Sequence, residues 1–160
     1  MPDLQFVELQ KFDAETWMAL LNLERIRHHL MPHPMFDGAA VQVWLESKLR
    51  VDEQIGCRVR AIALDEQLVG WCGIQAEADH YELAAVVDPA SWGIGRSLLR
   101  QLLTWSSELG HSEVALHLLH TRRKYRFLER RAQRIESTQV LGNSFVTYWL
   151  STAKYDLSAN

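Results

Sequence analysis

The stretch that decides the fold runs from Tyr81 to Leu103 and reads YELAAVVDPASWGIGRSLLRQLL. It begins as an apolar strand, leaves that strand at Asp88-Pro89, turns at Gly93-Ile94-Gly95 and continues as an amphipathic helix. Glycines let an anion approach the backbone, and the first N–H groups of a helix carry roughly half a positive charge. The stretch therefore indicates a phosphate-binding turn. A merely tight connection between strand and helix is the alternative that one Gly-x-Gly leaves open.

Two helices follow a first strand near the N-terminus. The alternation of residues 4–10 predicts the strand. Asp13 is placed to cap a helix whose apolar residues recur as far as Leu30. The loop that follows contains two prolines, which cannot continue the helix. Asp37 then caps the second helix.

The middle of the chain is rich in strands. Residues 57–64 and 68–77 are joined by three residues, which forces an antiparallel hairpin. Residues 80–87 add the strand that leads into the glycine turn. After the helix, which Gly110 is placed to end, residues 114–119 form a short apolar strand of the kind found in sheets covered on both faces.

A basic helix and a hairpin complete the chain. Residues 122–134 hold seven of the 17 Lys and Arg residues against one acid, so this segment carries +6 and the remainder −9. A solvated helix face, a guide for phosphates and a nucleic-acid contact all fit such a cluster. Strands over residues 135–141 and 145–150, joined at Gly142-Asn143, form the closing hairpin.

This order of elements, βααβββαβαββ, resembles that of the GNAT N-acetyltransferase superfamily, whose glycine turn Gly93, Gly95, Arg96 and Ser97 match. The resemblance implies an α/β (α+β) fold: a mixed, mostly antiparallel central sheet of about six or seven strands with helices on both faces. We expect a single domain over residues 1–160. A doubly wound nucleotide-binding domain is the structural competitor, but residues 57–87 give three strands without a helix between them.

Two positions depart from the pattern of this superfamily. Ala90 stands where the glycine motif usually begins with Arg or Gln. Leu128 stands where the family often places a tyrosine that acts as an acid, and leucine donates no proton. These departures leave open a GNAT-like protein that binds CoA or acyl-CoA without catalysis. A nucleic-acid or partner-binding module that uses the basic helix is a third hypothesis, although few aromatic residues accompany its arginines.

The resemblance implies acetyl-CoA as the co-substrate and no metal cofactor. Backbone N–H groups of the glycine turn would hold its pyrophosphate, and its pantetheine arm would lie between the diverging fourth and fifth strands. Tight packing against a helix is the other interpretation of the Ala84-Ala85 pair there. The cofactor-binding residues predicted in this way are Ala85, Val86, Val87, Gly93, Ile94, Gly95, Arg96 and Ser97.

The resemblance also implies direct attack of a primary amine on the thioester. An ammonium group with a pKa near 10 is mostly protonated at about pH 7, so the amine needs a base. Glu82 is the predicted base, with His80 and Glu77 in reserve; a solvent-facing strand glutamate is the alternative. Tyr125 is the predicted acid, with Tyr148 as another option; ordinary core packing is the alternative for Tyr125.

The acceptor side follows from the same resemblance. The segment between the first two helices walls the acceptor pocket in similar proteins, which implies substrate contacts for His33, Met35 and Phe36, and for Asn143 in the last turn. An apolar wall would suit a hydrophobic or aromatic amine. The acceptor is expected to be a small molecule or a protein amine, and homodimers are common among similar proteins.

Metal and membrane sites are not expected. Cys57 and Cys72 lie in predicted strands without ligand partners and are expected to be buried, reduced thiols. The histidines gather at residues 28–33 and at residues 117–120, in neither case with a carboxylate or cysteine at ligand spacing. The chain has no apolar run of roughly 20 residues and no secretion signal at its start, so a cytoplasmic protein is expected.

Overall fold

The structure is a computed structural model that describes residues 2–27, 34–91, 93–119, 125–140 and 142–153. Its strands are β1 (Leu4–Val7), β2 (Arg58–Leu64), β3 (Gln67–Ala76), β4 (Tyr81–Val87), β5 (Glu113–Leu119), β6 (Ala132–Val140) and β7 (Asn143–Ser151). Its helices are the 3-10 turn η1 (Leu9–Lys11), α1 (Ala14–Leu21), α2 (Glu24–Arg27), α3 (Gly38–Glu53), α4 (Gly95–Glu108) and α5 (Arg126–Arg131).

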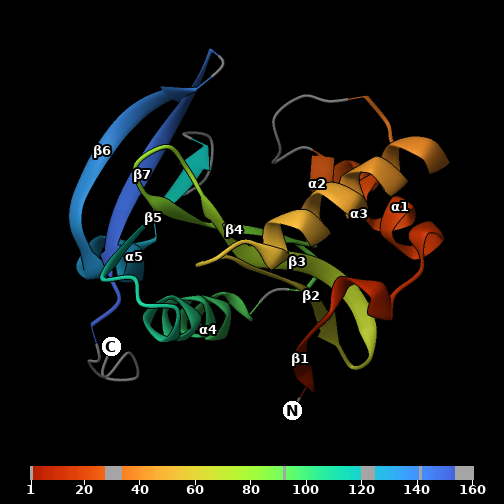
Figure 1. Ribbon diagram of the computed structural model, residues 1–160, viewed down its shortest axis with the longest axis horizontal. Helices are drawn as coiled ribbons and strands as arrows, with labels where there is room; N and C mark the ends of the chain where they lie inside the picture. Colours follow the sequence, from red (N-terminus) through yellow and green to blue (C-terminus); the bar gives the residue numbers. More distant parts are fainter. Residues whose placement is uncertain (1, 28–33, 92, 120–124, 141, 154–160) are drawn as a thin grey trace.

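The strands form one seven-stranded sheet in the order β1-β2-β3-β4-β5-β7-β6. The neighbours are antiparallel except for β4 and β5, which are parallel. Helices cover both faces of this sheet, with α4 on one side and α1 to α3 on the other (Figure 1). The predicted fold, a mixed and mostly antiparallel sheet between helices, is confirmed.

Each face of the sheet carries its own apolar core. On one face, α4 and Leu128 of α5 pack with Leu83 and Tyr148 of the sheet. On the other face, α1 to α3 pack on β2 and β3 around the fully buried Trp17, whose indole Nε1 donates to the Leu9 carbonyl at 3.0 Å. Because side chains alternate along a strand, β4 serves both cores.

Local signals define several of the element ends as expected. Asp13 caps α1 by accepting a hydrogen bond from the Thr16 N–H at 2.8 Å, and Asp37 caps α3 through the Ala40 N–H at 2.7 Å.

The connection from β2 to β3 is one residue shorter than predicted. Only Asp65 and Glu66 lie between the paired ends, both with positive φ, as the twist of a two-residue hairpin requires.

The first helix is shorter than predicted. It ends at Leu21, and α2 is a separate turn. The cause is Asn22, whose side chain accepts from the Phe36 N–H at 2.8 Å and donates to the Phe36 carbonyl at 2.9 Å. This pairing fixes the chain before α3 against the end of α1. Leu30 lies outside the described residues.

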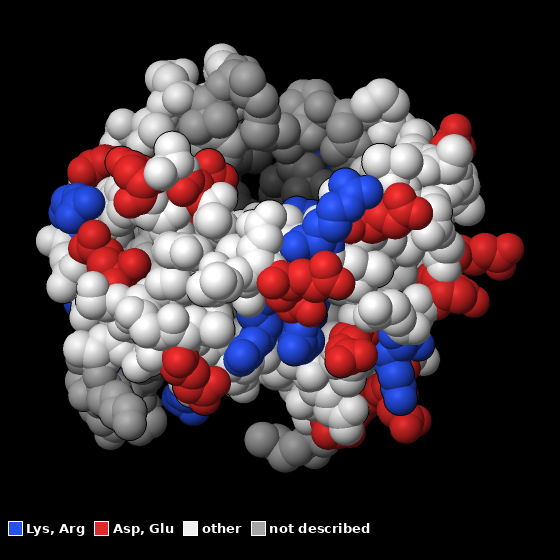
Figure 2. Space-filling model, in the orientation of Figure 1, with Lys and Arg blue, Asp and Glu red and all other residues white. Residues whose placement is uncertain are grey.

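The prediction of a continuous basic helix over residues 122–134 is wrong in its second half. The helix α5 ends at Arg131 and β6 begins at once, so Arg134 pairs with Trp149 of β7 and reaches Glu113 and Glu136. Residues 122–124 lie outside the described part of the chain. On the face drawn in Figure 2, basic and acidic side chains stand next to one another over the coloured surface.

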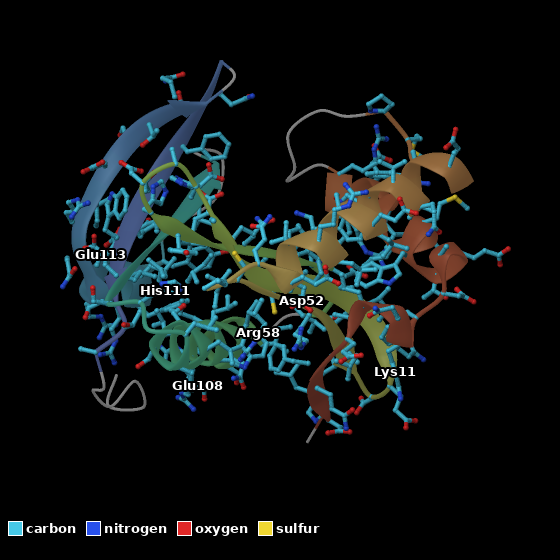
Figure 3. All side chains as sticks on the ribbon, in the orientation of Figure 1. Lys11, Asp52, Arg58, Glu108, His111 and Glu113 are labelled. Carbon is cyan, nitrogen blue, oxygen red and sulfur yellow. The ribbon has the colours of Figure 1, made fainter. Side chains whose placement is uncertain are left out.

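Ion pairs connect helices to the sheet. Arg58 of β2 pairs with Glu108 of α4 at 3.6 Å, and both are labelled below the sheet in Figure 3. Asp52 near the end of α3 accepts from Arg60 and from the Val59 N–H, each at 2.8 Å. β2 is thereby joined to α4 and to the end of α3.

Both cysteines are free and buried, as expected from their strand positions. Burial raises the pKa of the Cys72 thiol to about 12 and also raises the pKa of Cys57. Neither thiol is therefore ionised near neutral pH. Within the described ranges, no helix combines the length and the apolar character that crossing a bilayer needs.

Candidate active site

The turn between β4 and α4 leaves its glycines open. Gly93 has a φ of +100°, a conformation that favours glycine, and a Cβ at Gly93 or Gly95 would meet nothing within 4 Å. The helix α4 begins after Ile94 without a capping hydrogen bond from a side chain and without an acid in its first turn. The positive end of a 14-residue helix therefore faces open space, which suits an anion.

An ion pair holds the first part of this turn. Arg25 of α2 donates to both carboxylate oxygens of Asp88, from Nε at 2.6 Å and from Nη2 at 2.7 Å. Asp88 also accepts from the Ala90 N–H through its side chain and from the Ser91 N–H through its carbonyl. Hydrogen bonding from Arg25 lowers the pKa of Asp88 despite its burial. Sequence reasoning treated Asp88 only as a strand exit and missed this anchor.

Beyond its first residues, β4 has no partner on its β5 side within the described chain. All seven residues of β4 pair with β3, but the register with β5 consists of Glu82 with Ala115 and Leu83 with Leu116. From Ala84 to Val87 the two strands part. Ala85 is exposed, and Val86 and Val87 are half-buried.

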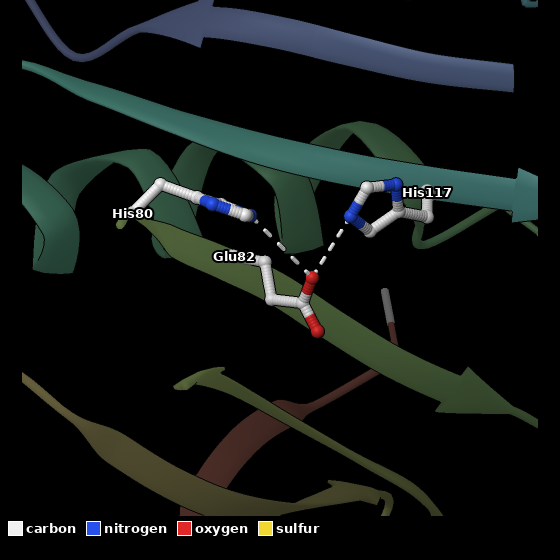
Figure 4. Close-up of side chains that lie close together, drawn as sticks. All are labelled: His80, Glu82 and His117. Carbon is white, nitrogen blue, oxygen red and sulfur yellow. Dashed lines mark ion pairs between the residues drawn. The ribbon is translucent and has the colours of Figure 1, made fainter. Parts of the chain in front are cut away.

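Glu82 lies at the closed end of this parting, between His80, which directly precedes β4, and His117 of β5 (Figure 4). Its Oε2 is 2.9 Å from Nε2 of His117 and 3.9 Å from Nε2 of His80. The three side chains are partly buried, with 19% of Glu82 and 23% of each histidine exposed. Glu82 is therefore a semi-buried carboxylate and not a solvent-facing strand residue.

The neighbours of Glu82 set its ionisation. Burial alone would raise its pKa, but hydrogen bonds with His117 and Glu77 and the charges of the histidines hold the pKa below the ordinary value. Burial and the Glu82 carboxylate raise the pKa of Glu77. Of the two carboxyl groups, Glu82 is the one that loses its proton at the lower pH. Lys48 of α3 adds a nearby cation, with Nζ 2.8 Å from Gln75 Oε1 and 4.3 Å above the Trp71 ring.

Both histidine rings are oriented through their second nitrogen. His117 Nδ1 is 2.6 Å from the Thr147 hydroxyl, which in turn lies 3.0 Å from the Thr138 hydroxyl. His80 Nδ1 is 2.7 Å from the Asp79 carboxylate, and its ring packs against Trp149 with centroids 5.0 Å apart. The cluster is therefore a fixed arrangement across β4, β5 and β7.

The structure brings a carboxylate to His117 that spacing along the chain did not reveal. The strand register places Glu82 opposite Ala115, so His117, two residues further on, lies on the same face as Glu82. A search by spacing along the chain could not find this cluster because His117 lies 35 residues beyond Glu82. Pairing of residues 80–87 with residues 114–119 was the signal that could have found it.

The comparisons with known proteins decide the family. A family model described as the acetyltransferase (GNAT) family matches residues 17–132, which is most of the chain. The chain belongs to the GNAT family. This membership supports acetyl transfer as the general activity and acetyl-CoA as the co-substrate. No curated protein matches the chain in sequence.

Solved structures share the GNAT fold at low sequence identity. An N-acetyltransferase from Staphylococcus aureus Mu50 is 13% identical, with a TM-score of 0.69 over 96% of this chain and 99% of that one. The spermidine N-acetyltransferase of Vibrio cholerae, in complex with CoA and spermine, is 14% identical, with a TM-score of 0.69 over 94% of this chain and 95% of that one. A ribosomal-protein-alanine N-acetyltransferase from Brucella melitensis is 18% identical, with a TM-score of 0.67 over 93% and 99%.

The residues predicted as the acid and as acceptor contacts lie in different parts of the structure. Tyr125 immediately precedes α5, partly buried, with its ring 5.7 Å from Phe127. Tyr148, the other predicted acid, is 2% exposed within the α4 core. Met35 is exposed just before α3, and Phe36 is held there by Asn22.

Asn143 and His33 are the other two residues predicted to contact the acceptor. Asn143 begins β7 at the tip of the last hairpin, which lies at the upper rim of the molecule in Figure 1, as does the start of α3. His33 lies outside the described residues.

The predicted cofactor-binding residues Ile94, Arg96 and Ser97 lie at the start of α4, where the sequence predicted a helix. Arg96 lies over the Phe127 ring at 5.6 Å.

Replacing Arg25 with Met removes both hydrogen bonds to Asp88 and keeps the aliphatic stem. Since Asp88 is buried and loses the guanidinium that donates to both of its oxygens, we expect the free energy of unfolding to fall relative to the wild type. Because the pKa of Asp88 is lowered in the folded state, this stabilisation is present above the ordinary pKa of about 3.9 and is lost as pH falls through the lower value.

Urea denaturation of both proteins at neutral pH and at about pH 3 measures this difference. Arg50→Met is the matched control because Arg50 is exposed and lies 3.9 Å from Glu46 on its own helix. Equal stabilities of the Arg25 and Arg50 variants at neutral pH would contradict the anchoring role of Arg25.

Proposed function

We propose that this protein is an acetyl-CoA-dependent N-acetyltransferase that transfers the acetyl group directly to a primary amine of a small molecule or a protein. The observation that carries the proposal is the parting of β4 from β5, with the open start of α4 beyond one end and the Glu82 carboxylate at the other. Residues 82–87 span about 16 Å at roughly 3.3 Å per residue, which suits an extended linker between a diphosphate and a thioester.

The α4 end of the site would hold the phosphates. The N–H groups of Gly93, Ile94, Gly95, Arg96 and Ser97 surround the open side of the turn, and the helix dipole favours an anion there. In the segment Ala85, Val86 and Val87, backbone groups point alternately toward β3 and away from it, and those that face away would bond the pantetheine arm. The bound co-substrate supplies the acetyl group as an activated thioester.

Glu82 would take the proton of the attacking amine, directly or through water. It is ionised, and it shares its site with His117, to which a proton can pass. The negative charge at Glu82 also favours the approach of a cationic amine. Glu77, whose pKa is raised by burial and by the Glu82 carboxylate, is the reserve candidate for a base.

Tyr125 would donate the proton to the departing thiolate. Its support is its place beside Phe127, since the Phe127 ring contacts both Tyr125 and Arg96 in the first turn of α4. Leu128, at the usual tyrosine position, is 3% exposed and packs in the core. This burial keeps the alternative of a non-catalytic CoA-binding protein in view, and the Tyr125 experiment below addresses it.

The acceptor would enter near Met35, Phe36 and Asn143, whose segments lie at the same rim of the molecule (Figure 1). Solved structures with this fold include enzymes named for spermidine and for a ribosomal-protein alanine, so the fold serves both classes of amine. Buried reduced thiols fit a reducing compartment such as the cytoplasm.

The phosphate site is tested by Gly95→Asp. A side chain at Gly95 meets open space, and an acid in the first turn of α4 stabilises the helix, so the fold should keep its stability. The same carboxylate repels a diphosphate, and we expect acetyl-CoA to bind at least about tenfold more weakly in isothermal titration. Gly38→Asp is the control, because Gly38 begins α3 in equally open space. Wild-type affinity in the Gly95 variant would remove the diphosphate from this turn.

The base is tested by Glu82→Gln. This change preserves size and removes the negative charge, so the turnover number should fall by about a hundredfold or more across about pH 6–9, while acetyl-CoA affinity is kept. Thiol release with a panel of amines measures the rate. Glu46→Gln on the exposed face of α3 is the control. An unchanged turnover number would assign the proton transfer to another group.

The acid is tested by Tyr125→Phe. Loss of the hydroxyl should lower the turnover number at least about tenfold and leave acetyl-CoA affinity unaltered, because the ring and its packing against Phe127 remain. Single-turnover thiol release and titration measure the two quantities separately. A normal rate excludes Tyr125 from the mechanism. Binding of acetyl-CoA by the wild type without turnover of any amine would instead favour the non-catalytic alternative.

A further inference from the structure

We propose that His80, Glu82 and His117 form a site for a divalent transition metal ion of the zinc class. An ion bound there would inhibit acetyl transfer by occupying the Glu82 carboxylate. The binding stands on the geometry of these side chains alone, and the inhibition rests on the proposed function.

The three side chains offer ligand atoms at suitable separations. These atoms all lie within 4.8 Å of one another, and the two shorter separations are 2.9 Å for Glu82 to His117 and 3.9 Å for Glu82 to His80. Tetrahedral ligands about 2.1 Å from a zinc ion lie about 3.4 Å apart. Small rotations of these side chains would bring the ligand atoms to that spacing, without movement of the strands.

The ring of His80 already presents a lone pair to the site. The Asp79 carboxylate, 2.7 Å from Nδ1, accepts only, so in the neutral ring the proton is on Nδ1 and Nε2 is unprotonated. His80 Nε2 is buried without a hydrogen-bond partner among the described atoms. An unpaired buried acceptor costs free energy, which a bound cation would recover.

Both histidines have the outer partners that metal-binding histidines require. Such histidines bond a carboxylate, carbonyl or water through the second ring nitrogen, which fixes the ring and raises its basicity. Here Asp79 holds His80, and the Thr147 hydroxyl, supported by Thr138, holds His117. Figure 4 shows the two rings on opposite sides of the Glu82 carboxylate, each with Nε2 directed toward it.

The donor set selects the class of metal. Two imidazoles and one carboxylate suit zinc and neighbouring transition metals, whereas magnesium and calcium prefer oxygen ligands. Three protein ligands leave a fourth position for water. The charges nearby are Glu77 and Asp79, which favour a cation, and Lys48, which opposes it. Partial exposure of all three ligands gives the ion a path from solvent.

A bound ion would compete directly with catalysis. Glu82 cannot accept a proton from an amine while its lone pair coordinates a metal, and the added positive charge repels an ammonium group. Zinc would therefore inhibit at the acceptor side and leave the phosphate site at the start of α4 untouched.

Calorimetric titration of chelator-treated protein with ZnCl₂ tests the site without acetyl-CoA or amine, so its failure would leave the acetyltransferase proposal standing. We expect one ion per chain, bound at micromolar concentration or below. His80→Ala and His117→Ala should each weaken binding at least about tenfold. Asp79→Asn removes no ligand and should still weaken binding about tenfold, because the ring of His80 loses its orientation.

Matched controls are His111→Gln and Glu46→Gln. His111 bonds the Gly56 carbonyl, and Glu46 lies on the exposed side of α3, so both lie outside the cluster and should leave zinc affinity unchanged. Thermal melts verify that every variant is folded. No binding to folded wild type at about 100 µM zinc, or unchanged affinity in both histidine variants, overturns the site. Stoichiometric binding at this site without loss of acetyl transfer overturns the inhibition alone.

Discussion

The parallel pairing of β4 with β5 extends over two register positions in the described chain, while β4 pairs with β3 and β5 with β7 over seven positions each. The sheet is therefore two antiparallel halves that meet along a short parallel seam. Beyond this seam, backbone groups of both strands need partners from water or from a ligand. The short parallel pairing of β4 with β5 thus leaves an open strand edge. It also brings Glu82 of one half of the sheet beside His117 of the other half.

The helix α4 makes this arrangement stable. A parallel connection needs a crossover, and α4 provides it while its apolar face, including Leu98, Leu102 and Trp105, covers the core beneath both halves. Its N-terminus comes to the open side of the seam because the crossover starts where β4 ends. The Arg25–Asp88 pair then fixes the intervening turn to α2, so both helical layers define the position of the open amides.

Sequence patterns predicted the parts of the fold that depend on nearby residues. The helix caps at Asp13 and Asp37, the antiparallel hairpins and the helix after Gly95 each follow from signals within a few positions. The errors concern elements whose ends depend on distant partners. Asn22 separates α1 from α2 by bonding Phe36, and Arg134 joins a strand because β7 offers a register for it.

The residues of the candidate site also fall into two groups: those that the sequence could predict and those that depend on distant partners. The glycine turn could be selected from the chain itself, and Glu82 could be selected from the resemblance to the GNAT pattern. The His80–Glu82–His117 cluster and the Asp88 anchor could not be selected, because each joins residues from elements that are far apart in sequence. A carboxylate in a strand reveals its chemistry only after the neighbouring strand and its register are known.

The protonated state of Cys57 and Cys72 has a practical value for enzymology. Cleavage of an acyl thioester liberates a sulfhydryl, which is commonly followed with a disulfide dye that reacts with thiolates. Since burial keeps both protein thiols protonated and shielded, the folded protein should contribute little background colour. The same shielding allows a cysteine introduced on an exposed loop to carry a fluorophore at one defined position, without removal of the native pair.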